Sequence, residues 1–337
     1  DLRLGALRKA RTGSSPGQYL SQRICGGISG GFTSAFTMKA DVENKRVVRL
    51  GLAAFQKAGA GGAARQQQLK SASERTTAVA ILEIDHLNVN FDGIQALQDV
   101  SLAVEPGQLF ALVGPNGAGK TTVFNCLSRI CRQDSGEIRF KGNEISRLAP
   151  HEVPGAGIGR TFQNIELIAR LTTLENIMLG RHLTTPTGLL SSLLFTRGVR
   201  RAETEARRAA EEVIALLELE AFRNLQVGTL SYGIRKRIAL GRALALEPEL
   251  LLLDEPAAGM NVEETEELAW YVGEICSGLG MATVLIEHDM RFVMDLSDRV
   301  CVLDHGQVVT TGRPDEVQQH PDVIAAYLGG NHAAATG

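Results

Sequence analysis

The chain has 337 residues, of which 44% are hydrophobic and 22% are charged, and its net charge is −3. This length and composition predict one large globular domain or two modest ones. No apolar run approaches the roughly 18 residues that a membrane-spanning helix needs. We therefore expect any membrane role to be peripheral.

The cysteines show no spacing that is typical of a metal site. Their odd number, without the pattern of a disulfide framework, favours reduced thiols in a cytosolic compartment. We interpret the last four as ordinary small core residues. The five are Cys25, Cys126, Cys131, Cys276 and Cys301.

Charge separates the first 75 residues from the rest of the chain. They contain 13 Lys and Arg but only 4 Asp and Glu, a net charge of +9, which leaves −12 for the remainder. Glycine pairs interrupt any sustained period, so we predict a disordered N-terminal extension and assign it no function. A targeting peptide, an upstream fusion or mis-assigned start, and a nucleic-acid-binding arm stay open as explanations.

The first strand signals begin near Val79. Residues 80–87 alternate like a half-buried strand, and this pattern continues to Phe91. Asp92-Gly93 is a turn signal, and residues 96–104 are predicted to form the returning strand. The apolar run at 109–113 is predicted to be a buried strand.

A glycine-rich segment follows that run directly and fits the phosphate-loop pattern G-x-x-x-x-G-K-[ST]. Its glycines let successive N–H groups curl around a phosphate, and the helix that follows adds its positive dipole end. Lys120 is predicted to reach the β- and γ-phosphates, and the Thr121 hydroxyl to bind Mg²⁺. The segment predicts that the chain binds a nucleoside triphosphate through Gly114, Pro115, Asn116, Gly117, Ala118, Gly119, Lys120, Thr121 and Thr122.

Helices and strands alternate in the rest of the chain. We predict an inserted helical subdomain at 164–227, in which Ala206, Ala210, Val213 and Leu217 share one helix face. The elements predicted outside it are a helix to about 129, a strand at 136–140, a helix from the cap Ser231 to 246, strands at 250–253 and 281–286, a helix at 263–276, a hairpin at 299–311, and short helices near 314 and 321.

Two predicted strands end in charged residues. Asp254 and Glu255 follow one strand, and His288 follows the other by two residues. Ligands of open α/β sheets bind at the carboxyl ends of the strands. There, a carboxylate such as Asp254 can hold Mg²⁺ through its water shell, and Glu255 can accept a proton from an attacking water. Each residue alone is weak evidence, as is Gln163 in the loop after Gly-Arg-Thr-Phe.

Taken together, the motifs resemble the ATP-binding-cassette ATPases over about residues 80–330. The resemblance is closest to the ATP-binding subunits of branched-chain amino-acid importers, and it rests on Gly159–Gln163, Asp254–Gly259 and the tail His320–Gly329. It implies an α/β fold, a P-loop NTPase core of this type with an antiparallel β subdomain and an inserted α-helical subdomain. The expected ATPase domain spans 79–330, and 331–337 form a short tail.

The resemblance also implies a role for each matched residue. The cofactors would be ATP and Mg²⁺, with Thr121, Gln163 and Asp254 serving the metal. Phe91 would stack on adenine, Glu255 would be the general base, and His288 would contact the γ-phosphate. Gln163 would couple the site to the membrane subunits. Ser231 and Gly233 would form a signature that caps the nucleotide bound by a partner protomer.

The implied partners are a second ATPase protomer, identical or related, membrane permease subunits and, indirectly, a substrate-binding protein. We expect a peripheral protein on the cytoplasmic face of the inner membrane that powers uptake of branched-chain amino acids. A urea or amide importer is a live alternative. A soluble cassette protein acting on DNA or ribosomes is less well supported, because the body after residue 75 is acidic, and no nucleic-acid partner is expected. A small-molecule kinase would leave the signature and His288 without a use.

Two positions depart from the commonest family pattern. The signature is Leu-Ser-Tyr-Gly-Ile instead of Leu-Ser-Gly-Gly-Gln, so Tyr232 and Ile234 change its flanks while Ser231 and Gly233 are kept. Asn261 stands where many members have an aspartate. It keeps a polar contact but loses the charge, and we expect communication across the dimer to differ.

The N-terminal segment yields a first prediction. A protein that begins at Thr76 should fold and hydrolyse ATP at the rate of the full chain, because the removed segment lacks the periodicity of packed structure. Circular dichroism and steady-state ATPase assays would test this. Protease-resistant structure in the segment, or loss of folding on its removal, contradicts the prediction.

Overall fold

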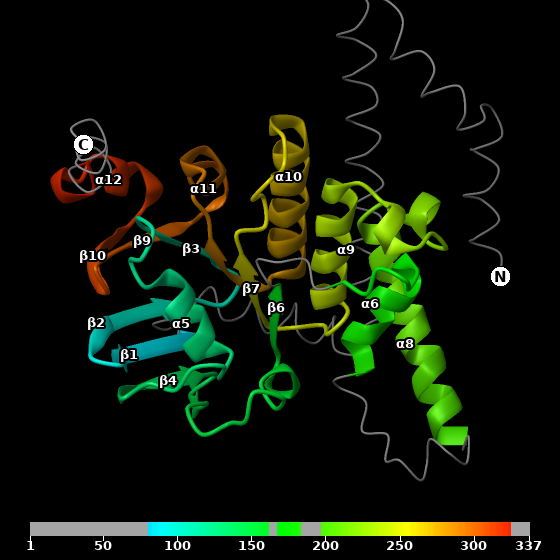
Figure 1. Cartoon of the computed structure of the whole chain (residues 1–337), viewed down its shortest axis with the longest axis horizontal. Helices are drawn as coiled ribbons and strands as arrows, with labels where there is room; N and C mark the ends of the chain where they lie inside the picture. Colours follow the sequence, from blue (N-terminus) through cyan, green and yellow to red (C-terminus); the bar gives the residue numbers. More distant parts are fainter. Residues whose placement is uncertain (1–79, 162–166, 183–196, 325–337) are drawn as a thin grey trace, which may run out of the picture. The chain divides into compact units, whose positions relative to one another are not determined.

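A computed structural model describes residues 80–161, 167–182 and 197–324 (Figure 1). The predictions for the N-terminal extension, for Gln163 and for the C-terminal tail beyond 324 concern residues outside these ranges. Two β-sheets organise the described part of the chain. The first is antiparallel and contains, in spatial order, β2 (Ile94–Val104), β1 (Leu82–Phe91), β4 (Ser135–Phe140) and β5 (Asn143–Glu144).

The second sheet carries the strands of the phosphate-loop region. It is parallel except at one edge, where β10 pairs antiparallel with β9. Its spatial order is β10 (Gln307–Gly312), β9 (Arg299–Asp304), β3 (Leu109–Val113), β8 (Ala282–Ile286), β7 (Leu250–Asp254) and β6 (Ile158–Thr161). The edge strand β6 was not predicted, because four residues that include a glycine are too few to show a period.

Strand β7 is buried along its whole length because both of its faces are covered. Side chains alternate between the faces of a strand. Leu250 and Leu252 pack with the antiparallel sheet and with α5 (Lys120–Leu127), whereas Leu251 and Leu253 pack against helices on the opposite face. The run of four leucines thus joins the two main parts of the core.

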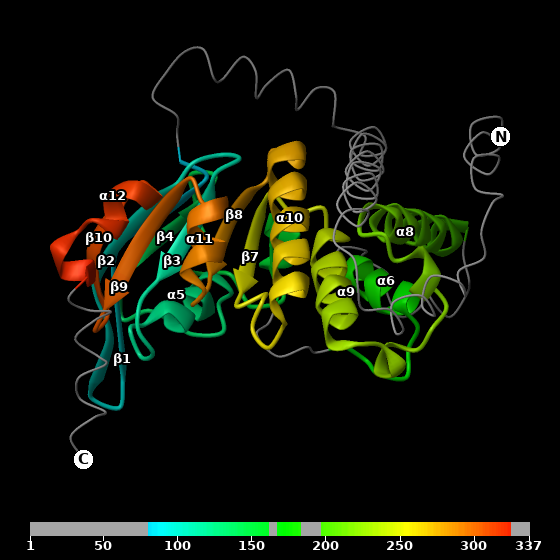
Figure 2. The ribbon, with the colours of Figure 1, turned by 90° about the horizontal axis from the view of Figure 1, so that it is seen from above.

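The opposite face is covered by α9 (Tyr232–Leu244) and α10 (Val262–Leu279). Both views place α10 beside β7 and α9 next to α10 (Figures 1 and 2). Helices α6 (Thr173–His182) and α8 (Arg197–Leu216) contact each other and α9. Near the other edge, α11 (Met290–Leu296) and α12 (Pro314–Gln318) pack in a smaller cluster with β3 and β9.

Helix α8 agrees with the predicted amphipathic pattern and begins at Arg197. The four residues of the predicted apolar face are all buried, three of them in α8 (Ala206, Ala210 and Val213) and the fourth, Leu217, directly after it. Among the described residues, no helix has both the length and the apolar character needed to span a membrane. Short 3-10 helices occur at Pro154–Ala156, Glu220–Phe222 and Val227–Thr229.

Candidate functional site

The predicted phosphate loop connects the end of β3 to the start of α5, and two of its glycines are required by space. A Cβ on Gly114 would lie 2.1 Å from the carbonyl oxygen of Leu303. One on Gly119, the N-cap of α5 at φ 99°, would lie 2.8 Å from the carbonyl oxygen of Ala96. Gly119 therefore lets the loop approach β2 closely. The first residue of β2, Ile94, pairs with Phe91 at the end of β1.

Lys120 begins α5 and folds back over the loop. Its ammonium donates hydrogen bonds to the carbonyl oxygens of Gly114, at 2.7 Å, and Pro115, at 2.9 Å. The residue is only 6% exposed, and this burial lowers the pKa of its ammonium. Loss of hydration makes the charge available for a strong interaction with an anion that enters the loop.

Asp254 ends β7 in a buried ion pair. Its Oδ2 accepts a hydrogen bond at 2.7 Å from Arg160 of β6, and the two side chains are 2% and 9% exposed. The same guanidinium also donates to Asn125 and Ser128 in and after α5, at 3.0 Å each. Arg160 thus ties the strand end that carries Asp254 to the helix that begins at the phosphate loop.

The other carboxylate oxygen of Asp254, Oδ1, is buried and has no hydrogen-bond partner among the residues that the structure describes. A buried oxygen of this kind is unfavourable unless it is coordinated. Thr121, an exposed hydroxyl in the first turn of α5, is the second oxygen donor that the sequence assigns to the metal. Oxygen atoms are the ligands that Mg²⁺ prefers, so this donor set fits Mg²⁺ bound together with nucleotide phosphates.

Glu255 and His288 are brought together from two neighbouring strands. Glu255 Oε1 lies 2.5 Å from His288 Nε2, with side chains that are 13% and 44% exposed. Glu255 has a φ of 45°, a left-handed conformation that is uncommon for a residue with a side chain. The pair can orient a water molecule and take its proton, since the carboxylate is an acceptor held at a fixed position.

The predicted signature lies at the start of α9. Ser231 is the N-cap, and its hydroxyl accepts from the backbone N–H of Ile234 at 3.5 Å. A Cβ on Gly233 would lie 2.7 Å from Glu264 Oε1, so this position requires glycine or a shift of Glu264. Glu264 also forms a capping box with Asn261 at the start of α10.

The ring of Tyr232 lies beside Gly259, where a Cβ added to the glycine would be 3.4 Å from its Cε1. Arg235 and Lys236 stack on the same ring at 5.7 and 5.6 Å from its centroid. The two departures from the family pattern thus have structural uses. Tyr232 lies beside Gly259 in the segment after β7, and Asn261 caps α10.

Phe91, predicted to stack on adenine, ends β1 and is 48% exposed, which leaves its ring accessible to a planar ligand. The structure thus brings together the phosphate loop with Lys120 and Thr121, the strand-end residues Asp254 and Glu255, and His288. Gln163 lies outside the described residues. Ser231 and Gly233 form their own local unit at the start of α9.

Sequence reasoning assigned no role to three charged residues that support this site. They are Arg160, which pairs with Asp254, Lys236 of α9, and Glu287 at the end of β8. Glu287 had a detectable signal, because it follows an apolar strand directly and precedes His288. Lys236 and Arg160 had none, since their burial follows from contacts between distant segments.

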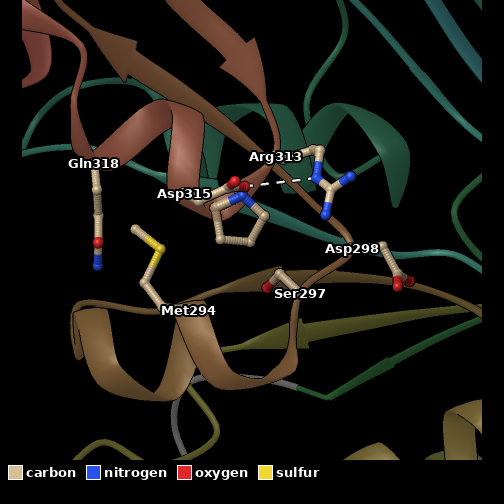
Figure 3. Close-up of a pocket in the computed structure, with 7 residues that line it drawn as sticks. Met294, Ser297, Asp298, Arg313, Asp315 and Gln318 are labelled. Carbon is tan, nitrogen blue, oxygen red and sulfur yellow. Dashed lines mark ion pairs between the residues drawn. The ribbon is translucent and has the colours of Figure 1, made fainter.

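A separate polar hollow lies between α11 and α12 (Figure 3). Arg313 and Asp315 form an ion pair at 3.5 Å across its rim, and Met294, Ser297 and Gln318 contribute to its lining. It contains none of the residues predicted to bind phosphate. We therefore give this hollow no role in the predicted binding of nucleotide.

Comparison of the sequence with known families and proteins gives a consistent result. The model of the ABC transporter family matches residues 97–258, and that of the branched-chain amino acid ATP-binding cassette transporters matches 307–333. The high-affinity branched-chain amino acid transport ATP-binding protein BraF of Pseudomonas aeruginosa is 41% identical over 249 residues, which are 74% of this chain and 98% of BraF. LivG of Escherichia coli K12, with the same description, is 39% identical over equal shares.

Solved structures with a similar fold are ATP-binding cassettes. The ADP conformation of a cassette from an ABC transporter has a TM-score of 0.65 and 29% identity, covering 75% of this chain and all of the other. A dimeric cassette in a post-hydrolysis state, bound to ADP and phosphate, has a TM-score of 0.59 and 25% identity, and covers 69% and 98% of the two chains.

The buried ion pair yields a prediction about stability. Arg160→Met should lower the free energy of unfolding by about 3–5 kcal/mol, because it leaves the Asp254 carboxylate buried without its counter-charge. The matched control is Arg139→Met, which removes an exposed ion pair with Glu137 and should change the stability by less than about 1 kcal/mol. Urea unfolding would measure both.

A double variant tests whether the two charges act as a pair. Arg160→Met combined with Asp254→Asn should lose less stability than the sum of the two single variants, because neither charge is then left alone. Additive losses would mean that the ion pair is not coupled.

Proposed function

Because the chain belongs to the ABC transporter family, as one of its ATP-binding proteins, we propose that it is the ATPase subunit of a branched-chain amino-acid importer. The family and its relatives make the chain an ATP-hydrolysing enzyme. The observation that carries the assignment of its reaction centre is the pair of Glu255 and His288, 2.5 Å apart, next to Asp254.

The proposed binding of ATP uses a series of partial and full positive charges. The backbone N–H groups of 114–119 and the N-terminus of α5 would surround the phosphates, and Lys120 would move its ammonium from the loop carbonyls to the β- and γ-phosphates. The exposed ring of Phe91 would stack on adenine. Thr121, Asp254 and Gln163 would hold Mg²⁺, which supplies charge neutralisation of the phosphates when bound.

Hydrolysis then needs a water held in line with the γ-phosphate. We assign Glu255 as the general base that takes the proton of this water, and His288 as the residue that contacts both Glu255 and the γ-phosphate. The half-buried carboxylate keeps its acceptor oxygen away from bulk water, which favours the contact with one bound water.

The substrate and partners follow from the relatives. BraF and LivG are described as branched-chain amino acid transport proteins, and the match at 307–333 is to a model of that transporter group. We propose a peripheral protein at the cytoplasmic face of the membrane that is bound to separate permease subunits. A substrate-binding protein would deliver the substrate to these subunits. Two ATPase protomers would enclose the nucleotide between the phosphate loop of one and Ser231 and Gly233 of the other, with Gln163 transmitting the change to the permease.

Glu255→Gln should reduce ATP hydrolysis by about 10²–10⁴-fold, because it removes the base and keeps the shape of the side chain. The affinity for a fluorescent ATP analogue should stay the same. Lys120→Ala is the matched contrast and should weaken that affinity directly. Hydrolysis by Glu255→Gln at the parent rate, or an unchanged affinity of Lys120→Ala, would contradict the corresponding assignment.

The transport function is tested with the protein and its genetically linked permease subunits in proteoliposomes that contain the matching substrate-binding protein. We expect ATP-dependent uptake of radioactive leucine, and loss of uptake when Glu255→Gln replaces the parent chain. Uptake of urea or of an amide in place of leucine would overturn the assigned substrate and keep the transporter function. ATP hydrolysis without any coupled uptake would support the soluble cassette protein instead.

A further inference from the structure

Two oppositely charged residues are buried behind the reaction centre without a place in the reaction itself. Lys236 of α9 is 5% exposed and Glu287, which follows β8, is 4% exposed. Burial of either charge is unfavourable, and it lowers the pKa of Lys236 and raises the pKa of Glu287. Charged groups are rarely buried unless hydrogen bonds compensate for the lost hydration, so we examined which groups these two residues contact.

Glu287 joins the two loops that carry Glu255 and His288. Its Oε1 accepts a hydrogen bond from the backbone N–H of Ala257 at 2.8 Å, two residues after Glu255. Its Oε2 accepts one from the N–H of His288 at 3.0 Å. One carboxylate therefore fixes the backbone after β7 to the backbone after β8, using a different oxygen for each.

Lys236 holds the other side of the same arrangement. Its ammonium donates to the backbone carbonyl oxygen of Glu255 at 3.1 Å, and the N–H of Glu255 donates to the carbonyl oxygen of Ile286 at 2.9 Å. Both backbone polar groups of Glu255 are thus bonded. These bonds matter because the left-handed conformation of Glu255, at φ 45°, is strained and persists only where the surroundings enforce it.

We propose that Glu287 and Lys236 are positioning residues for ATP hydrolysis, which hold Glu255 and His288 in register through the backbone of their loops. The inference rests on the assignment of Glu255 as general base. The carboxylate of Glu287 sets the distance between the loops, and Lys236 sets the direction in which Glu255 projects. Because Lys236 belongs to the helix that Ser231 caps, the alignment of the base depends on the position of α9.

The test measures kcat, KM and thermal midpoint for the full chain, together with its affinity for a fluorescent ATP analogue. Glu287→Gln keeps the volume but replaces one acceptor oxygen by an NH₂ group, which then faces a backbone N–H. We expect kcat to fall about 10- to 100-fold, the effect of a small misplacement of reacting groups. KM and the affinity should stay within about twofold, because the phosphate loop is untouched.

The matched control is Glu218→Gln, a half-buried carboxylate that follows α8. It should leave kcat at the parent value while it removes the same charge. A kcat of Glu287→Gln equal to that of the control, or a rise in KM with kcat unchanged, would overturn the proposal.

Variants of Lys236 give a second test of the proposal, which holds even if the Glu287→Gln variant does not fold. Lys236→Met removes the donor and keeps the apolar stem, so kcat should fall in the same range. Lys236→Arg places a donor near the same carbonyl oxygen and should recover part of the loss. Equal rates for the Met and Arg variants would show that packing, and not the hydrogen bond, matters.

A combined variant separates positioning from a general loss of structure. Adding Glu287→Gln to Glu255→Gln should lower kcat much less than Glu287→Gln does alone, because the base that Glu287 positions is already gone. A multiplicative loss overturns the proposal. If Glu255→Gln hydrolyses ATP at the parent rate, the assigned base is wrong. If it is inactive while Glu287→Gln keeps the parent kcat, only the present inference fails.

Discussion

The proposed reaction centre depends on the register of two parallel strands. Asp254 at the end of β7 pairs with Ile286 at the end of β8, so the chain leaves both strands at the same level of the sheet. The next residues, Glu255 on one side and Glu287 with His288 on the other, are therefore neighbours although they are more than thirty positions apart. A shift of this register by one residue would turn the buried side chains to the opposite face and separate Glu255 from His288.

Burial of charge around this register is a second constraint. Asp254, Arg160, Lys236 and Glu287 are each almost fully covered, and each has a charged partner or backbone groups as compensation. In surroundings with little water, electrostatic interactions are stronger than at the surface. The arrangement therefore gives a rigid support for Glu255 and a polar environment that is set before the nucleotide binds. The same lack of water makes each of these charges sensitive to removal of its partner.

The segment after β7 also connects the proposed reaction centre to the predicted signature. Tyr232 lies against Gly259, Lys236 donates to the carbonyl oxygen of Glu255, and Glu264 contacts both the capping residue Asn261 and the space beside Gly233. These contacts lie within one protomer. A movement of the start of α9 would thus shift Lys236 and, through its hydrogen bond, the backbone of Glu255 in the same protomer. This effect would add to any signal carried across a dimer.

The sequence by itself determined the local chemistry. The phosphate loop, the strand run at 250–253, the cap at Ser231 and the helix face from Ala206 to Leu217 are short-range patterns, and strand, turn and helix preferences act over neighbouring residues. They were enough to single out Lys120, Thr121, Asp254, Glu255 and His288 as the candidate site residues. The resemblance of motif order supplied the kind of fold.

Only the tertiary structure decided that 158–161 form an edge strand, because that strand exists through its pairing with β7. It also decided the partners of Asp254 and Glu255, since Arg160, Lys236 and Glu287 come from three separate segments. Long-range burial and strand register set these contacts, so the hydrophobic periodicity of neighbouring residues in the sequence could not predict them.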